Sequence, residues 1–266
     1  MSSRTLSLVL ALAAVACNGA PDDDDPETAT ADLVGGNPDL RWSASGYLAS
    51  TTSDADPEKP ACGATLIAPR VVVTAAHCVV DASRSFAFGT GHPGSGPLVP
   101  VVERHFHPRF HAEAEGAVDL VHALRKFDLA YLVLEREVEG VTPAELPDEA
   151  PSAGCSIQAI GHRQEGAAPG RRVSTPACIL LRLNLGGDPI FEVHPQGFTA
   201  LCVADGDEGS AVVERDAGRT VLVGIHVGSV TQGLTDCRRG TQFLNGYESM
   251  FGYRDFLLEG IAQASR

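Results

Sequence analysis

From residue 33 onward, the apolar positions fall in short runs of β-branched and aromatic residues that glycine and proline separate. Thr65–Ile67 and Val71–Val73 lie on either side of Pro69 and predict a β-hairpin. The second half has further runs of this kind: Ile157–Ile160, Cys178–Leu183, Phe191–Val193, Ala211–Val213 and Val221–Ile225. Short strands broken by turn residues are typical of barrels, so we expect an all-β fold. The end of the chain differs, because the spacing of Phe256, Leu257 and Ile261 predicts a C-terminal helix over residues 253–266.

The first 32 residues have a different composition and do not contribute to this fold. A positive start at Arg4 precedes an apolar run, Leu6–Ala16, that is too short to span a membrane as a stable helix. We interpret residues 1–16 as a signal peptide. Residues 17–32 hold a run of aspartates with almost nothing apolar to bury, which predicts an acidic disordered tether. Residues 33–266 are then one domain.

The end of the apolar run carries the first of seven cysteines. Ala14–Cys17 resembles a bacterial lipobox, and this resemblance implies an exported cell-envelope lipoprotein that is lipidated at Cys17 and held at the membrane by its lipid. Ordinary cleavage after Ala16, with secretion, also fits the small residues there. An odd cysteine in an exported chain favours lipidation. The other six cysteines predict three disulfides.

Charge narrows the classes of partner. The formal net charge of the chain is −14, which argues against nucleic acid as a ligand. We expect a protein or peptide ligand instead, with no cofactor and no bound metal.

Three segments carry a resemblance to the trypsin/chymotrypsin family of serine peptidases. Thr74–Cys78 (Thr-Ala-Ala-His-Cys) resembles the family segment with the catalytic histidine, and Asp128–Leu132 resembles its Asp-Ile-Ala-Leu motif. Gly206–Ala211 resembles its Gly-Asp-Ser-Gly-Gly-Pro signature. The resemblance implies two six-stranded antiparallel β-barrels, at about residues 33–140 and 153–252, and a C-terminal helix. It makes His77 the general base and Asp128 the carboxylate that orients it.

The nucleophile is where this chain departs from the family. Glu208 stands in the place of the attacking serine. A carboxylate is a weak nucleophile toward an amide and would form a high-energy anhydride, so acylation is not expected. Its longer side chain would also crowd the oxyanion donor, which the resemblance places at Gly206. We expect the Glu208 carboxylate to reach toward His77 and pair with its imidazolium.

Other positions implied by the resemblance concern activation, disulfides and the pocket. Leu33–Gly36 resembles the Ile-Val-Gly-Gly start of the mature family domain, whose α-amino group pairs with the aspartate at Asp207; Asp32 precedes it where a trypsin-activated zymogen has a basic residue. The family pattern implies disulfides Cys62–Cys78 and Cys202–Cys237, and Cys155–Cys178 remains. Val227 and Gly228 replace the family's serine and tryptophan beside the substrate.

These features lead to three hypotheses. The first is a non-hydrolytic, lipid-anchored domain that binds a protein or peptide in the cell envelope. The second is an active serine endopeptidase that uses Ser210, which lies two residues after Glu208 and between small residues. The third is a metal site formed by His77, Asp128 and Glu208.

Overall fold

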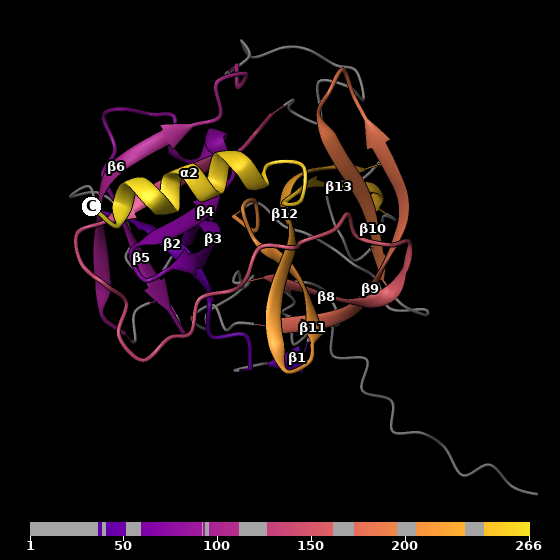
Figure 1. Cartoon of the computed structure of the whole chain (residues 1–266), viewed down its shortest axis with the longest axis horizontal. Coiled ribbons are helices and arrows are strands. Elements are labelled where there is room, and N and C mark those ends of the chain that lie inside the picture. Colours follow the sequence, from indigo (N-terminus) through magenta and orange to yellow (C-terminus); the bar gives the residue numbers. More distant parts are fainter. Residues whose placement is uncertain are drawn as a thin grey trace, which may run out of the picture.

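The computed structural model describes residues 37–38, 41–51, 60–91, 93, 96–111, 127–161, 173–195, 206–231 and 242–266. Two β-barrels lie side by side, and one helix crosses the face of the first (Figure 1). The predicted signal peptide and tether, with Cys17 and Leu33, are outside the described residues, as are Cys202 and Cys237. No helix in the described part of the chain is both long and apolar enough to cross a membrane.

The first barrel closes through six antiparallel strands in the order β2-β3-β4-β7-β6-β5. The strands are β2 (Ser45–Ser50), β3 (Pro60–Ala68), β4 (Val71–Thr74), β5 (Phe86–Thr90), β6 (Leu98–Phe106) and β7 (Ala130–Leu134). The predicted hairpin is confirmed, because Thr65 of β3 pairs with Val73 of β4. All residues of β4 and β7 are buried, as β-branched and large apolar strands inside a closed barrel should be.

The second barrel has the same strand number. Its strands are β8 (Gly154–Gly161), β9 (Val173–Asn184), β10 (Pro189–Pro195), β11 (Ala211–Asp216), β12 (Arg219–Thr231) and β13 (Gln242–Ser249). They follow the order β9-β10-β13-β12-β11-β8, and pairing of β8 with β9 closes the ring. The short strand β1 (Asn37–Pro38) extends β9 at its edge. The double six-stranded barrel expected from the sequence is therefore confirmed.

Helix α2 (Arg254–Ala264) confirms the predicted C-terminal helix and packs on the first barrel (Figure 1). Leu257 and Gly260 are its buried residues. A Cβ at Gly260 would lie 2.8 Å from the Tyr131 ring of β7, so glycine allows the helix to approach the barrel closely.

One apolar core joins the two barrels. It contains Leu66 and Leu132 from the first barrel together with Leu222, Ile225 and Val227 from the second. The connecting segment supports this junction, since the Ala144 amide donates to Leu66 and the Leu222 amide donates to Glu145. The polar groups described next lie where the two barrels meet.

Two disulfides are present among the described cysteines: Cys62–Cys78 and Cys155–Cys178. The first ties β3 to the short 3₁₀ helix η1 (Ala76–Val79), and the second ties β8 to β9. Both pairings match those expected from the sequence. Stable disulfides are typical of proteins exported to an oxidising compartment.

Candidate functional site

The first element of the site is the His77–Asp128 pair. His77 lies in η1, directly after β4, and Asp128 lies just before β7, which is the neighbour of β4 in the first barrel. The His77 amide donates to Asp128 Oδ1 at 2.8 Å, and the ring Nδ1 lies 2.5 Å from Oδ2. Because a carboxylate only accepts, Nδ1 carries the proton. The pair therefore fixes the ring and leaves Nε2 available on the other side.

The second element is the turn Gly206–Ser210, which comes from the second barrel. The Gly209 amide donates to His226 of β12 at 2.7 Å, and the His226 amide donates to Ser210 at 2.8 Å. The carbonyl of Glu208 accepts from the Gly63 amide of β3 at 2.8 Å. These bonds hold the turn against both barrels. They also place Glu208 beside the Cys62–Cys78 disulfide, with the Glu208 carbonyl oxygen 3.7 Å from Cys78 Sγ.

Gly209 explains why this turn needs glycine. Its φ is +79°, a left-handed conformation that residues with a Cβ rarely adopt. A Cβ there would also lie 2.3 Å from the Gly63 carbonyl oxygen and 2.4 Å from Thr74 Oγ1. The turn that carries Glu208 is therefore compatible with the first barrel only while residue 209 has no side chain.

The carboxylate of Glu208 binds within its own turn. Its Oε2 accepts a hydrogen bond from the Gly206 amide at 2.6 Å. This amide is the group that the sequence analysis assigned as the oxyanion donor. A short bond from an amide to a carboxylate is charge-assisted and stronger than a bond between neutral groups.

The prediction of an ion pair between Glu208 and His77 was wrong. No ion pair joins these two residues in the described part of the chain, and the contact recorded for His77 Nε2 is Cys78 Sγ at 3.8 Å. The physical reason is local: the Gly206 amide is two residues away and satisfies the carboxylate without a protonated imidazole. Asp128 already supplies the anion that holds the ring.

Ser210, the alternative nucleophile considered from the sequence, ends the turn that carries Glu208. Its side chain is buried, and Oγ has no hydrogen-bond partner among the described residues. The hydroxyl lies against the backbone of Gly63, where an added Cβ would be 2.2 Å from Oγ. The structure does not bring Ser210 into hydrogen-bonding contact with His77.

His226 is a site residue that the sequence reasoning missed. It is buried in β12, and burial lowers its pKa to about 4, so the ring is neutral at neutral pH. The charge of Glu208 acts in the opposite direction on this pKa, and that of His77 acts in the same direction. In the sequence, His226 is only one position of an altered pocket wall, and spacing alone does not reveal which way its ring points.

Asp207 is fully buried next to Glu208. Burial and, to a smaller extent, the Asp207 charge raise the pKa of Tyr247 in β13. The resemblance implies that Asp207 pairs with the α-amino group of Leu33, but Leu33 lies outside the described residues.

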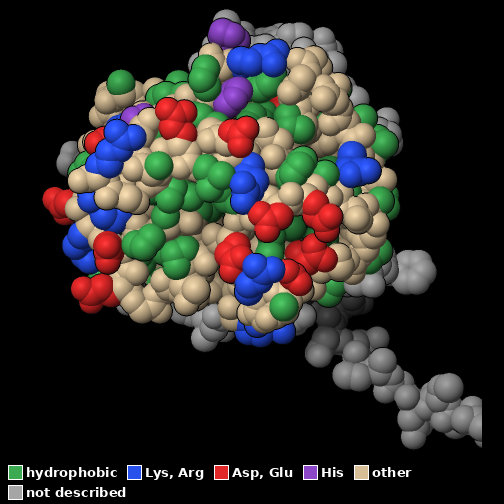
Figure 2. Space-filling model, in the orientation of Figure 1, with side chains coloured by type: hydrophobic (Ala, Val, Ile, Leu, Met, Phe, Trp, Pro, Cys, Tyr) green, Lys and Arg blue, Asp and Glu red, His purple; other side chains and the backbone are tan. Residues whose placement is uncertain are grey.

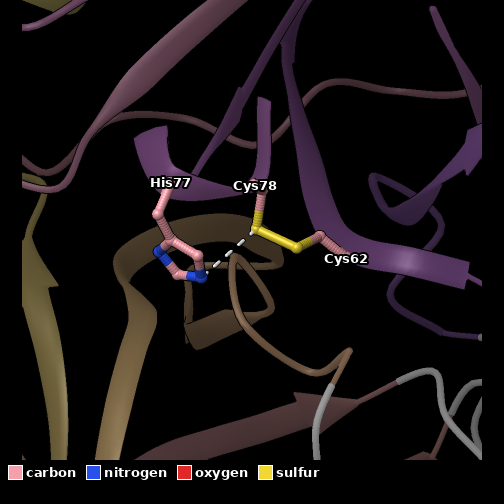
Figure 3. Close-up of side chains that lie close together, drawn as sticks. All are labelled: Cys62, His77 and Cys78. Carbon is pink, nitrogen blue, oxygen red and sulfur yellow. Dashed lines mark hydrogen bonds between the residues drawn. A yellow bond between two sulfur atoms is a disulfide. The ribbon is translucent and has the colours of Figure 1, made fainter. Parts of the chain in front are cut away.

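Potential metal ligands meet at one place in the described part of the chain. Cys62, Cys78 and His77 bring their ligand atoms within 4.8 Å of one another (Figure 3). The two sulfur atoms are bonded to each other, however, and zinc binds thiolates rather than a disulfide. His77, Asp128 and Glu208, the trio considered from the sequence, do not come together in this way.

The described part of the chain also has a surface cavity that includes neither His77 nor Asp128. Its volume is about 450 Å³, and it lies between the connecting segment and the β11–β12 hairpin. Arg219, one of its lining residues, pairs with Glu145 and Asp216. The cavity contains none of the predicted site residues. Acidic side chains also gather on the face shown in Figure 2, in keeping with the net charge of −14.

Comparison with known proteins agrees with this geometry. A model of the trypsin family matches residues 34–250. The chain is also 26% identical over 214 residues to a vitellin-degrading protease of Bombyx mori, and the match covers 75% of this chain and 76% of that protein. The family match spans both barrels and includes His77, Asp128 and the Gly206–Ser210 turn. The chain therefore belongs to the trypsin family.

Proposed function

We propose that this trypsin-family domain does not hydrolyse peptides and instead binds a protein or peptide ligand at the cell envelope, held there by a lipid on Cys17. The hydrogen bond from the Gly206 amide to the Glu208 carboxylate is the observation that carries the proposal. Acylation needs a hydroxyl nucleophile next to the base and a free donor for the developing oxyanion. In this chain the Glu208 side chain stands where the hydroxyl would be, and its carboxylate occupies the Gly206 amide.

The retained His77–Asp128 pair supports a binding role. The pair is fully formed, with the Asp128 carboxylate buried and bonded twice to His77. Nothing in that pair would prevent catalysis, so the proposed loss of hydrolysis depends on Glu208. A trypsin-family site without a nucleophile can hold a peptide and leave it intact.

The test uses a fluorophosphonate probe, which labels activated serines, on the mature chain. We expect no labelling of the wild-type protein. We expect Glu208→Ser to gain labelling that disappears when His77→Ala is added, because the base is already in place. Labelling of the wild-type protein that is lost in Ser210→Ala would overturn the proposal and favour the endopeptidase that uses Ser210.

Ligand binding is tested separately with a panel of fluorescent peptides and anisotropy. A ligand in the cleft should lose affinity in His77→Ala by about tenfold, the effect of one lost contact of about 1.4 kcal/mol. Arg219→Ala is the matched control, because it changes the distant cavity and should leave affinity unchanged. Equal loss in both variants, or no binding by any peptide, would count against the cleft as the binding site.

The anchor is tested by palmitate incorporation in cells. Wild-type protein should incorporate label and partition into detergent, while Cys17→Ser should do neither. Release of unlabelled wild-type protein to the medium would support simple secretion instead.

A further inference from the structure

A second group of buried acids lies behind the His77–Asp128 pair. Asp188 precedes β10, Glu248 belongs to β13, and both side chains are almost completely inaccessible, as is Asp128. The hydroxyl of Tyr253, at the start of α2, donates to Asp188 Oδ1. Three carboxyl groups are thus buried together, which is costly unless protons or hydrogen bonds compensate for the charge.

Asp188 and Glu248 hold the backbone that presents Asp128. The Phe127 amide donates to Asp188 Oδ2 at 2.6 Å, and the Asp128 amide donates to Glu248 Oε1 at 3.0 Å. Phe127 has a φ of +57°, a left-handed conformation that a residue with a side chain adopts only when its surroundings impose it. The two acids therefore bind both amides of a strained turn directly before β7.

The hydrogen bonds indicate where a proton is needed. Both oxygens of Asp188 accept bonds, and Glu248 Oε1 accepts one, but Glu248 Oε2 is buried without a donor among the described residues. The Glu248 and Asp188 carboxyl groups nevertheless lie close together, because they accept from the successive amides of Asp128 and Phe127. Two ionised carboxylates cannot bond to each other, whereas a proton on Oε2 makes it a donor.

The described groups around Asp188 and Glu248 supply no compensating cation. Among the described residues, no basic side chain pairs with Asp188 or Glu248. His107, which follows β6, stacks on Phe127, and burial lowers its pKa. Arg109 lies over the Phe127 ring, with its guanidinium carbon 3.9 Å from the ring centroid, and donates to the Gly186 carbonyl. Tyr253 stays neutral, because burial raises its pKa further above its ordinary value. Burial and the Asp188 charge likewise raise the pKa of Glu248.

We propose that Asp188 and Glu248 hold one proton between them at neutral pH, and that this proton positions the Phe127–Asp128 turn and, through Asp128, the His77 ring. Asp188 and Glu248 are positioning residues here, since neither touches His77. The inference does not depend on whether the domain hydrolyses peptides.

The direction of the pH effect follows from proton binding. A carboxyl that keeps its proton in the folded state binds more protons than the same group in the unfolded chain, whose pKa is about 4.3. Stability from this proton is therefore complete below about pH 4.3 and is lost as pH rises toward the raised pKa of the folded state. One proton changes the unfolding equilibrium constant by up to tenfold per pH unit in that window.

Urea unfolding of the mature, disulfide-intact protein between pH 5 and pH 8 tests the shared proton. Glu248→Gln keeps the acceptor for the Asp128 amide and supplies a permanent donor, so it should remove this pH dependence. The unfolding constant of the wild type relative to Glu248→Gln should rise by up to tenfold per pH unit. Glu259→Gln, on the exposed face of α2, is the control and should follow the wild type. Parallel profiles of wild type and Glu248→Gln would overturn the proposal.

A proton NMR spectrum tests the positioning role. The hydrogen between His77 Nδ1 and Asp128 should give a far-downfield signal, because the two atoms are 2.5 Å apart. We expect this signal in the wild type and Glu248→Gln, and a shift or loss of it in Glu248→Ala and Asp188→Asn. An unchanged signal in a folded Glu248→Ala would sink the positioning role. If Glu248→Ala does not fold, Asp188→Asn decides the point in the same way.

Discussion

The Glu208 carboxylate accepts a hydrogen bond from the Gly206 amide, two residues earlier, at 2.6 Å. Our proposal assigns Glu208 to the nucleophile position and the Gly206 amide to the oxyanion donor, so under it the carboxylate occupies the donor that would stabilise an oxyanion. Glu208 would then hold permanently a negative charge that an active enzyme develops only during the reaction. Binding to that amide by a substrate carbonyl requires the carboxylate to leave first.

The Gly206–Glu208 bond should contribute to stability. Glu208→Ala removes the acceptor, and we expect a loss of about 1 kcal/mol in the free energy of unfolding, because the freed amide of a half-buried residue regains some contact with water. Glu208→Gln keeps a neutral acceptor and should lose less. Urea unfolding at pH 7 measures both. A Glu208→Gln loss as large as that of Glu208→Ala would mean that the charge, and not the acceptor, is what matters.

His226 should make the protein less stable in acid. Burial lowers its folded pKa to about 4 from about 6.5, so the unfolded chain binds more protons between those values. Its stability contribution is present above about pH 6.5 and falls by up to about 3 kcal/mol as pH drops to 4. His226→Gln should flatten the dependence of unfolding free energy on pH between pH 6.5 and pH 4. Subtracting the His226→Gln curve from the wild-type curve isolates the contribution of His226 from the opposite slope that Glu248 causes. Curves that stay parallel from pH 7 to pH 4 would contradict the neutral, buried imidazole.

Gly209 and Gly218 offer a matched pair of substitutions. Both have left-handed backbones, with φ of +79° and +87°, but a Cβ at Gly218 meets open space and one at Gly209 meets Gly63 and Thr74. Gly218→Ala should cost about 1 kcal/mol from backbone strain alone. Gly209→Ala should cost at least about 3 kcal/mol, since backbone atoms must move as well. Thermal unfolding measures both, and equal effects would show that contact between the barrels does not constrain this turn.

The Cys155–Cys178 disulfide should stabilise the second barrel without affecting the site. It closes a loop with a sequence separation of 23 residues between β8 and β9. The double variant Cys155→Ser, Cys178→Ser should lose about 3 kcal/mol, the value expected for loops of this length. The downfield His77 signal should remain, because β8 and β9 do not carry the His77–Asp128 pair. Loss of that signal in a folded double variant would show coupling between this disulfide and the site.

Much of the architecture was predictable from the sequence. The hairpin around Pro69, the second-barrel strands and the C-terminal helix each follow from local patterns of apolar residues and turn residues, and all are present. The sequence also predicts His77 and Asp128 as site residues, because each lies in a distinctive local motif, and the structure brings their side chains together. The proposed departure at Glu208 also comes from the sequence, since it concerns which atoms are available for the chemistry.

The partners of these groups were decided by the tertiary structure. The sequence led us to expect that Glu208 pairs with His77, but the fold gives the carboxylate a nearer donor in Gly206 and gives the ring to Asp128. His226 and Glu248 read as ordinary members of two strands until β12 and β13 bring them behind the site. Local patterns determine strands and turns because those depend on neighbours in the chain. Hydrogen bonds and proton positions depend on which distant side chains share a buried volume, and only the folded barrels determine that.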